Sequence, residues 1–156
     1  AQVQTVPTIK WPNDVQIGGL KVSGILIEAD SGVGNLHYAL VGIGINVDLE
    51  VCDYPEIAQM ATSIATESAT PVDRTALLID VLKRLDEMYA SVRAGRSLSN
   101  EWANRIETLG KAVQVSWGHE VIEGVARDVD ERGNLIVERP DGTRVTVAGG
   151  EVTLRV

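Results

Sequence analysis

The sequence predicts an α+β fold, in which a mixed sheet with helices is followed by a small β-barrel. Three observations lead to this prediction. Seven of the 15 glycines precede residue 45 and punctuate strand-like runs, no glycine lies between Val47 and Gly95, and β-branched residues with turn signals dominate after Gly110. We therefore expect two domains, residues 1–109 and residues 110–156.

The first stretch has the pattern of short strands joined by tight turns. A hairpin loop is expected over Asp30–Asn35, whose residues tolerate positive φ. The final strand is apolar on both faces from Ala39 to Ile45, which predicts a central, buried strand. The expected strands are Thr8–Trp11, Val15–Ile17, Ser23–Ala29 and Leu36–Val47.

The middle stretch has helical periodicity. A weak helix is expected over Glu56–Ile64. The residues Thr70-Pro71-Val72-Asp73 are a typical helix start, and apolar residues then recur at steps of three and four until Gly95. This spacing predicts an amphipathic helix. A shorter helix is expected over Leu98–Leu109.

The last stretch alternates in β periodicity. Val113, Val115 and Trp117 lie at alternate positions, and turn signals follow at Gly118-His119, 131–134 and 140–142. About five short strands in fewer than 50 residues predict a small barrel of SH3 or OB type.

Composition narrows the classes of function. The formal charge is −8 and the pI is about 4.7, so neither a nucleic acid nor an anionic membrane surface is an expected partner. No apolar run approaches the roughly 20 residues of a membrane-spanning helix, and the first residues lack a signal-peptide pattern. The single Cys52 excludes an internal disulfide and a Cys-cluster zinc site. We expect a cytoplasmic protein.

Candidate chemistry concentrates in two segments. His37 and His119 have no second ligand at metal-binding spacing, so no metal site is certain, and Cys52 has no neighbouring base. Lys10-Trp11-Pro12-Asn13-Asp14 surrounds a proline turn with a cation, an amide and a carboxylate. The segment 21–26 faces the two glycines of 42–46; glycine weakens a strand and suits the close approach of a flat ligand. Both a ligand site and a purely structural turn remain open here.

These segments carry a resemblance to a known family. Lys10-Trp11-Pro12-Asn13-Asp14, Lys21-x-x-Gly24-Ile25-Leu26-x-Glu28 and Val41-Gly42-Ile43-Gly44-Ile45-Asn46-Val47 resemble the consecutive motifs of biotin–protein ligases. The stretches 61–64 and 150–155 also resemble the later part of that family. The resemblance implies a class II aminoacyl-tRNA synthetase/biotin ligase-like sheet, followed by an SH3-like barrel.

The resemblance also implies a reaction and residue roles. Such enzymes form biotinyl-5′-AMP from biotin and ATP, and then biotinylate a lysine of a biotin carboxyl carrier protein. Lys21 would be the catalytic cation and would also bind biotin. The implied biotin-binding residues are Lys21, Gly24, Leu26 and Gly42, and the implied ATP-binding residues are Asn13, Asp14 and Asn46. Asp14 would also help to hold Mg²⁺. For Arg155 two alternatives stay open: a solvated terminal residue, or one that reaches back to the site.

One departure from the family pattern shapes the expectation. No Gly-Arg-Gly triplet of the family's biotin- and phosphate-binding loop occurs in this chain. We therefore expect the C-terminal part of a longer ligase, or one piece of a split one, able to form a homodimer through sheet edges. Two alternatives remain: a lipoate–protein ligase-like enzyme, and a non-catalytic biotin-binding or dimerisation module.

Overall fold

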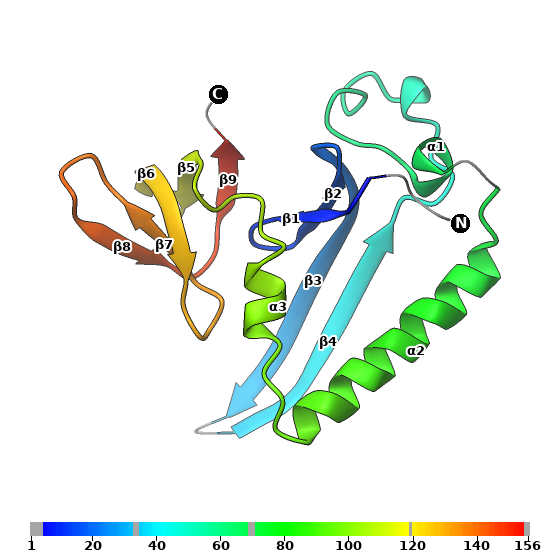
Figure 1. The fold of residues 1–156 in the computed structure, drawn as a ribbon, viewed down its shortest axis with the longest axis horizontal. Helices are drawn as coiled ribbons and strands as arrows, with labels where there is room; N and C mark the ends of the chain where they lie inside the picture. The colour runs from blue at the N-terminus through cyan, green and yellow to red at the C-terminus, as the bar shows by residue number, and fades with distance from the viewer. Residues whose placement is uncertain (1–4, 33–34, 69–70, 119, 155–156) are drawn as a thin grey trace. The chain divides into compact units, whose positions relative to one another are not determined.

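The structure is a computed structural model that describes residues 5–32, 35–68, 71–118 and 120–154. Its strands and α-helices, labelled in Figure 1, follow the order expected from the sequence, with strands first, helices next and strands last. They are β1 (Thr8–Lys10), β2 (Asp14–Ile17), β3 (Leu20–Gly32), β4 (Asn35–Ile45), the 3₁₀ turn η1 (Val51–Asp53), α1 (Ile64–Glu67), α2 (Arg74–Arg93), α3 (Ser99–Ala103), β5 (Ala112–Trp117), β6 (Glu120–Val129), β7 (Leu135–Glu138), β8 (Arg144–Val147) and β9 (Glu151–Leu154).

The chain divides into two compact units. The first unit comprises Ala1–Pro7 and Asn13–Arg74, and the second comprises Thr8–Pro12 and Thr75–Val156. Each unit is described by itself below. The prediction of an α+β fold with a small barrel at its end is confirmed.

The first unit is built on the antiparallel strands β2, β3 and β4. β3 and β4 form the long hairpin seen in Figure 1. The expected loop over Asp30–Asn35 is wrong for its described residues, because the ladder continues through Asp30↔Tyr38 to Gly32↔Asn35. The remaining two residues of that loop, 33 and 34, lie outside the described residues.

The prediction of a central, buried β4 is wrong for the part of the chain that the structure describes. β4 is the last strand in the order of its sheet, and the side chains of Leu40 and Val41 are 59% and 49% exposed. Apolar residues on both faces are typical of a strand covered on both faces. β4 therefore has apolar residues on both faces without being a central strand.

The expected helix over Glu56–Ile64 is also wrong. Turns occupy residues 55–60, and the helix α1 begins only at Ile64. Ser63 is its N-cap, and the Ser63 hydroxyl accepts a hydrogen bond from the main-chain N–H of Thr66 at 3.3 Å. Serine and threonine favour caps over helix interiors because their hydroxyls bond to the nearby main chain.

In the second unit, α2 confirms the long expected helix, although it starts at Arg74 rather than immediately after Thr70, which lies outside the described residues. No residue of α2 is buried. Among the described residues, no helix is both long and apolar enough to cross a membrane.

α3 ends at Ala103, well short of the expected Leu109, because the next residues bond to β1 instead. The Ile9 N–H donates to the Arg105 carbonyl at 2.8 Å, and the main-chain N–H of Glu107 donates to the Ile9 carbonyl at 2.8 Å.

The five expected strands of the terminal module are present, as Figure 1 shows, in the antiparallel order β8-β7-β6-β5-β9. This module is an SH3-like domain. Alternating apolar residues of these strands form the core together with Trp11 from the segment after β1. The buried members are Trp11, Ile106, Val113, Val115, Ile122, Ala126, Leu135, Val137, Val147 and Val152.

Trp11 is therefore a core residue. Its side chain is 1% exposed, and its indole Nε1–H donates to the Gly133 carbonyl at 2.8 Å. Its main-chain N–H donates to the Thr108 hydroxyl at 3.0 Å. A buried indole needs such a partner for its N–H group, so the Trp of the Lys-Trp-Pro-Asn-Asp motif anchors the motif's beginning.

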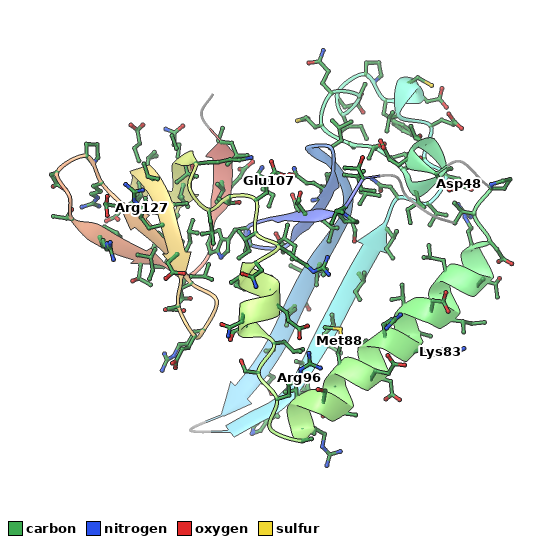
Figure 2. The ribbon with its side chains drawn as sticks, viewed as in Figure 1. Asp48, Lys83, Met88, Arg96, Glu107 and Arg127 are labelled. Atoms are coloured by element: carbon green, nitrogen blue, oxygen red, sulfur yellow. The ribbon has the colours of Figure 1, made fainter. Side chains whose placement is uncertain are left out.

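Charged pairs lie on the surface of the second unit (Figure 2). Glu107, in the segment between α3 and β5, is bonded by Lys111 and by the Thr8 hydroxyl, and both bonds lower the pKa of the Glu107 carboxyl. Arg127, on β6, donates to Glu138 at 2.9 Å and lowers the pKa of that carboxyl. Hydrogen bonds to a carboxylate favour its charged form.

Candidate functional site

A cavity of about 460 Å³ opens on the sheet of the first unit. It is lined by residues of β3 and β4, by the first residue of β2 and by the residue before β2, and all three motifs meet here. Its lining is Asn13, Asp14, Lys21, Gly24, Ile25, Leu26, Gly42, Ile43 and Gly44.

The strand register explains the shape of this cavity. Gly24 lies opposite Asp14 on β2 and opposite Gly44 on β4, and Leu26 lies opposite Gly42. Since alternate residues of a strand share a face, these five residues form two neighbouring rows on one side of the sheet. Three of the five are glycines, so the floor is flat and its main chain is accessible. Leu26, with a side chain 62% exposed, provides an apolar wall.

Lys21 reaches the same face through an irregularity in the ladder. The pairs run Asp14↔Gly24 and Val15↔Ser23, and the next pair is Gln16↔Lys21, so β3 carries one extra residue at this point. An extra residue shifts the alternation of a strand by one position. Strict alternation would place Lys21 and Gly24 on opposite faces; the bulge brings them together.

An ion pair holds the Lys21 side chain over the glycine floor. Its Nζ lies 2.6 Å from Asp14 Oδ1. A methyl group built on Gly24 would come within 3.2 Å of both Lys21 Cε and Nζ. The lysine side chain therefore crosses directly above Gly24. It is 46% exposed and Asp14 is 21% exposed, so the ammonium is open to an incoming anion.

The two predicted asparagines organise the main chain around this cavity. Asn13 Nδ2 donates to the Ile25 carbonyl at 2.7 Å, and the Ile25 N–H donates back to the Asn13 carbonyl at 3.1 Å. Asn46 follows the last residue of β4, and its Nδ2 donates to the Thr62 carbonyl at 3.1 Å and to the Lys21 carbonyl at 3.4 Å. Asn46 does not line the cavity itself. Nucleotide contacts by Asn13, Asp14 and Asn46 stay predictions.

The sequence does not predict that the segment 60–62 runs beside Lys21. Lys21 forms a parallel bridge with Ala61, and Thr62 and Ser63 are each 1% exposed. The available signal was the run Ala61-Thr62-Ser63, which is uncharged and rich in hydroxyls and therefore suits an extended segment with a helix cap. The weak helical pattern over Glu56–Ile64 predicts a helix for the same residues instead.

Other candidate groups are not gathered into a site. His37 Nδ1 lies 3.3 Å from Asp30 Oδ2, and Cys52 is an exposed free thiol. Within the described ranges, no group of three or more His, Cys, Asp or Glu residues could hold a metal ion. His119 and Arg155 lie outside the described residues.

A second cavity, of about 490 Å³, lies in the second unit between residues of α2 and the α3 region. Two of its arginines are paired with glutamates, Arg96 with Glu101 and Arg84 with Glu87. No residue of the three motifs lines this cavity. The cavity around Lys21 is therefore the candidate site.

Two family models match successive parts of this chain. The family model described as the biotin/lipoate A/B protein ligase family matches residues 2–46, and the model described as the biotin protein ligase C terminal domain matches residues 108–155. The two matches place the chain in the class of biotin/lipoate protein ligases. The chain belongs to the biotin protein ligase family.

Individual relatives support the same assignment. The biotin--[acetyl-CoA-carboxylase] ligase of Mycobacterium tuberculosis is 32% identical over 149 residues, which cover 94% of this chain and 53% of that protein. The bifunctional ligase/repressor BirA of Bacillus spizizenii is 29% identical over 92% of this chain and 45% of its own length. A biotin protein ligase from Aquifex aeolicus, solved in complex with biotin and ATP, has a TM-score of 0.77 and 29% identity, covering 98% of this chain and 63% of that one. The chain spans about half the length of the curated relatives it matches.

Proposed function

We propose that this chain is the portion of an ATP-dependent biotin–protein ligase that carries its catalytic lysine and its SH3-like domain. The observation that carries the proposal is the Lys21 ammonium held above a floor of glycines, in a cavity open to solvent. A flat ligand can lie on such a floor, and its carboxylate can reach the ammonium. The family matches and the relative solved with biotin and ATP support the same reading.

In the proposed reaction, the biotin carboxylate attacks the α-phosphorus of ATP, and pyrophosphate leaves. The amine of an acceptor lysine then attacks the acyl carbon of biotinyl-5′-AMP, and AMP leaves. Lys21 offsets the repulsion between the two anions and stabilises the charge that develops on the phosphoryl oxygens. Gly24, Leu26 and Gly42 form the biotin-binding surface.

Asn13, Asp14 and Asn46 form the nucleotide side of the proposed site. Asp14 is the one carboxylate among the residues that line the cavity. Mg²⁺ is commonly bound through one or two carboxylates together with substrate phosphates, so the residues present fit a Mg²⁺ ion that arrives with ATP. Asp14 would hold that ion, which would neutralise phosphate charge.

The wider context follows from the same proposal. The enzyme would be a biotin–[biotin carboxyl carrier protein] ligase, with the acceptor lysine domain of that carrier as its macromolecular substrate. We further propose a domain boundary after residue 109, a homodimer and a cytoplasmic location. The preceding half of the catalytic domain, with its Gly-Arg-Gly-Arg-type loop, would come from polypeptide outside these 156 residues.

Two alternatives are separated by simple measurements. A lipoate–protein ligase-like enzyme would bind lipoate in preference to biotin in titration calorimetry. A non-catalytic module would bind biotin but yield no product when the preceding half of a related ligase is added. The Lys-Trp-Pro-Asn-Asp and Gly-Ile-Gly-Ile-Asn strings favour a biotin ligase over a lipoate ligase. The absence of a Gly-Arg-Gly triplet from this chain favours the non-catalytic module.

The decisive experiment substitutes Lys21→Gln and measures biotinylation of an acceptor domain by streptavidin blot. The reactions contain ATP, Mg²⁺ and biotin, with and without the preceding half of a related ligase. Loss of a preorganised charge at a developing oxyanion should lower the rate roughly 100-fold or more. The unfolding free energy should change by less than about 1 kcal/mol, because the broken ion pair is partly exposed.

Lys83→Gln is the matched control. Lys83 lies on the exposed surface of α2, outside the proposed site, and this variant should keep the wild-type rate. A Lys21→Gln enzyme with near-full adenylate formation would refute the assignment of Lys21.

A further inference from the structure

The main-chain partner of β3 changes immediately beside the proposed catalytic lysine. β4 ends at Ile45 and no longer reaches Lys21. The segment 60–62 takes its place: the Lys21 N–H donates to the Met60 carbonyl at 2.8 Å, and the Lys21 carbonyl accepts from the Thr62 N–H at 2.9 Å. The backbone of Lys21 is thus bonded at both its polar groups to one short segment.

Asn46 joins three parts of the chain at this changeover. Its side-chain amide donates to the carbonyls of both Lys21 and Thr62. Its main-chain N–H donates to the Val22 carbonyl at 2.8 Å, and its main-chain carbonyl accepts from the Ile64 N–H at 2.9 Å. One residue therefore bonds to β3, to the segment 60–62 and to the start of α1.

Thr62 is anchored in turn by α1. Its side chain is 1% exposed, and its hydroxyl donates to Glu67 Oε1 at 2.8 Å. Ser63, equally buried, caps the same helix. Buried hydroxyls with satisfied hydrogen bonds hold a segment in one arrangement.

We propose that Asn46 and Thr62 are positioning residues for the Lys21 ammonium, acting by clamping the main chain of Lys21 between the end of β4 and the segment 60–62. The proposal deepens the proposed ligase function and rests on the role of Lys21 in it. Lys21 is the second residue of β3 and follows the Gly18-Gly19 turn, where both residues have positive φ. A strand end beside such a turn opens easily unless it is bonded on both sides.

The test first measures Lys21 itself, without any enzyme reaction. Trace acetylation followed by mass spectrometry reports the reactivity of Lys21 relative to Lys83 in the same molecule. The substitution Asn46→Asp keeps the shape of the side chain, but it replaces the N–H donor with an oxygen that is repelled by two carbonyl oxygens. We expect roughly fivefold faster acetylation of Lys21, because the strand end opens more often.

Two further variants keep the test decisive. Thr62→Val removes the hydroxyl that bonds Glu67 and should raise the reactivity of Lys21 in the same direction, whereas Thr62→Ser keeps this hydroxyl and should stay near wild type. Asn104→Asp, at the end of α3 in the other unit, is the matched control for the change of an asparagine to a charged residue. Circular dichroism identifies any variant that has lost its fold, and the Thr62 pair then decides the question.

Enzyme kinetics provide the second readout, with the preceding half of a related ligase added. Displacement of a catalytic group by about 1 Å can cost 100-fold in rate, so kcat for adenylate formation should fall roughly tenfold or more in Asn46→Asp, with a smaller change in the KM for ATP. A raised KM for ATP with unchanged acetylation of Lys21 would overturn the positioning role and leave Asn46 with only the nucleotide contact proposed above. If the wild type forms no adenylate, the ligase proposal fails, while the acetylation result still decides whether Asn46 positions Lys21.

Discussion

Gly24→Ala should separate the stability of this fold from the function of its site. The added methyl group would lie 3.2 Å from Lys21 Cε and Nζ and 3.5 Å from Asp14 Oδ1. Comfortable contacts between carbon atoms are about 3.5 to 4.0 Å. The lysine must therefore shift by about 0.3 to 0.8 Å, which changes the geometry of its ion pair with Asp14.

The structure sets the size of both effects. Lys21 is 46% exposed and can move into solvent, and Gly24 does not have a positive φ, so the backbone accepts alanine. Alanine gains about 0.4 to 1 kcal/mol by restricting the unfolded chain, which offsets a surface ion pair worth about 0.2 to 1 kcal/mol. The net change in unfolding free energy should stay below about 1 kcal/mol. If 1 Å costs about 100-fold in rate, a shift of this size costs roughly 4- to 40-fold.

The assay combines urea unfolding with the rate of pyrophosphate release, measured with the preceding half of a related ligase present. Gly42→Ala is the matched control. Among the residues that the structure describes, its added methyl group meets only the Leu26 carbonyl, at 3.7 Å, and leaves Lys21 in place. It should keep wild-type stability and wild-type acetylation of Lys21. A Gly24→Ala enzyme with kcat within twofold of wild type, or with a loss of more than about 3 kcal/mol in stability, would refute the reasoning.

Two other predictions concern the second unit. Gly124→Ala should destabilise it by about 3 kcal/mol through overpacking, because the added methyl group would lie 2.2 Å from the Glu138 carbonyl oxygen and 2.8 Å from Val137 Cγ1; an unchanged urea midpoint would contradict this close approach of β6 and β7. Stability should also fall as the pH drops from about 5 to about 3, because carboxyls whose pKa is lowered in the folded state bind fewer protons than in the unfolded chain. A urea midpoint that stays constant or rises over this range would show that these bonds do not stabilise the fold. The carboxyls concerned are Glu107, Asp130, Glu138 and Asp141, whose pKa values are lowered chiefly by bonds from Lys111, Asn134, Arg127 and Thr143 respectively.

Local patterns predicted the parts of this fold that local forces decide. The five strands of the terminal module follow from alternation and from glycine turns, and α2 follows from its three- and four-residue spacing. Predictions failed where a distant segment competes for the main chain. Residues 105–107 bond to β1 instead of extending α3, and the segment 60–62 pairs with Lys21 instead of forming a helix.

For the candidate site, the sequence by itself determined which chemical groups are present and that they occur in three ordered motifs. Only the tertiary structure decided how they meet. The extra residue in β3 places Lys21 on the face of Gly24, Trp11 enters the core, and Asn46 bonds to the main chain of Lys21. The physical reason is that a bulge and a hydrogen bond between distant segments depend on which strands become neighbours, and the periodicity of a single segment does not contain that information.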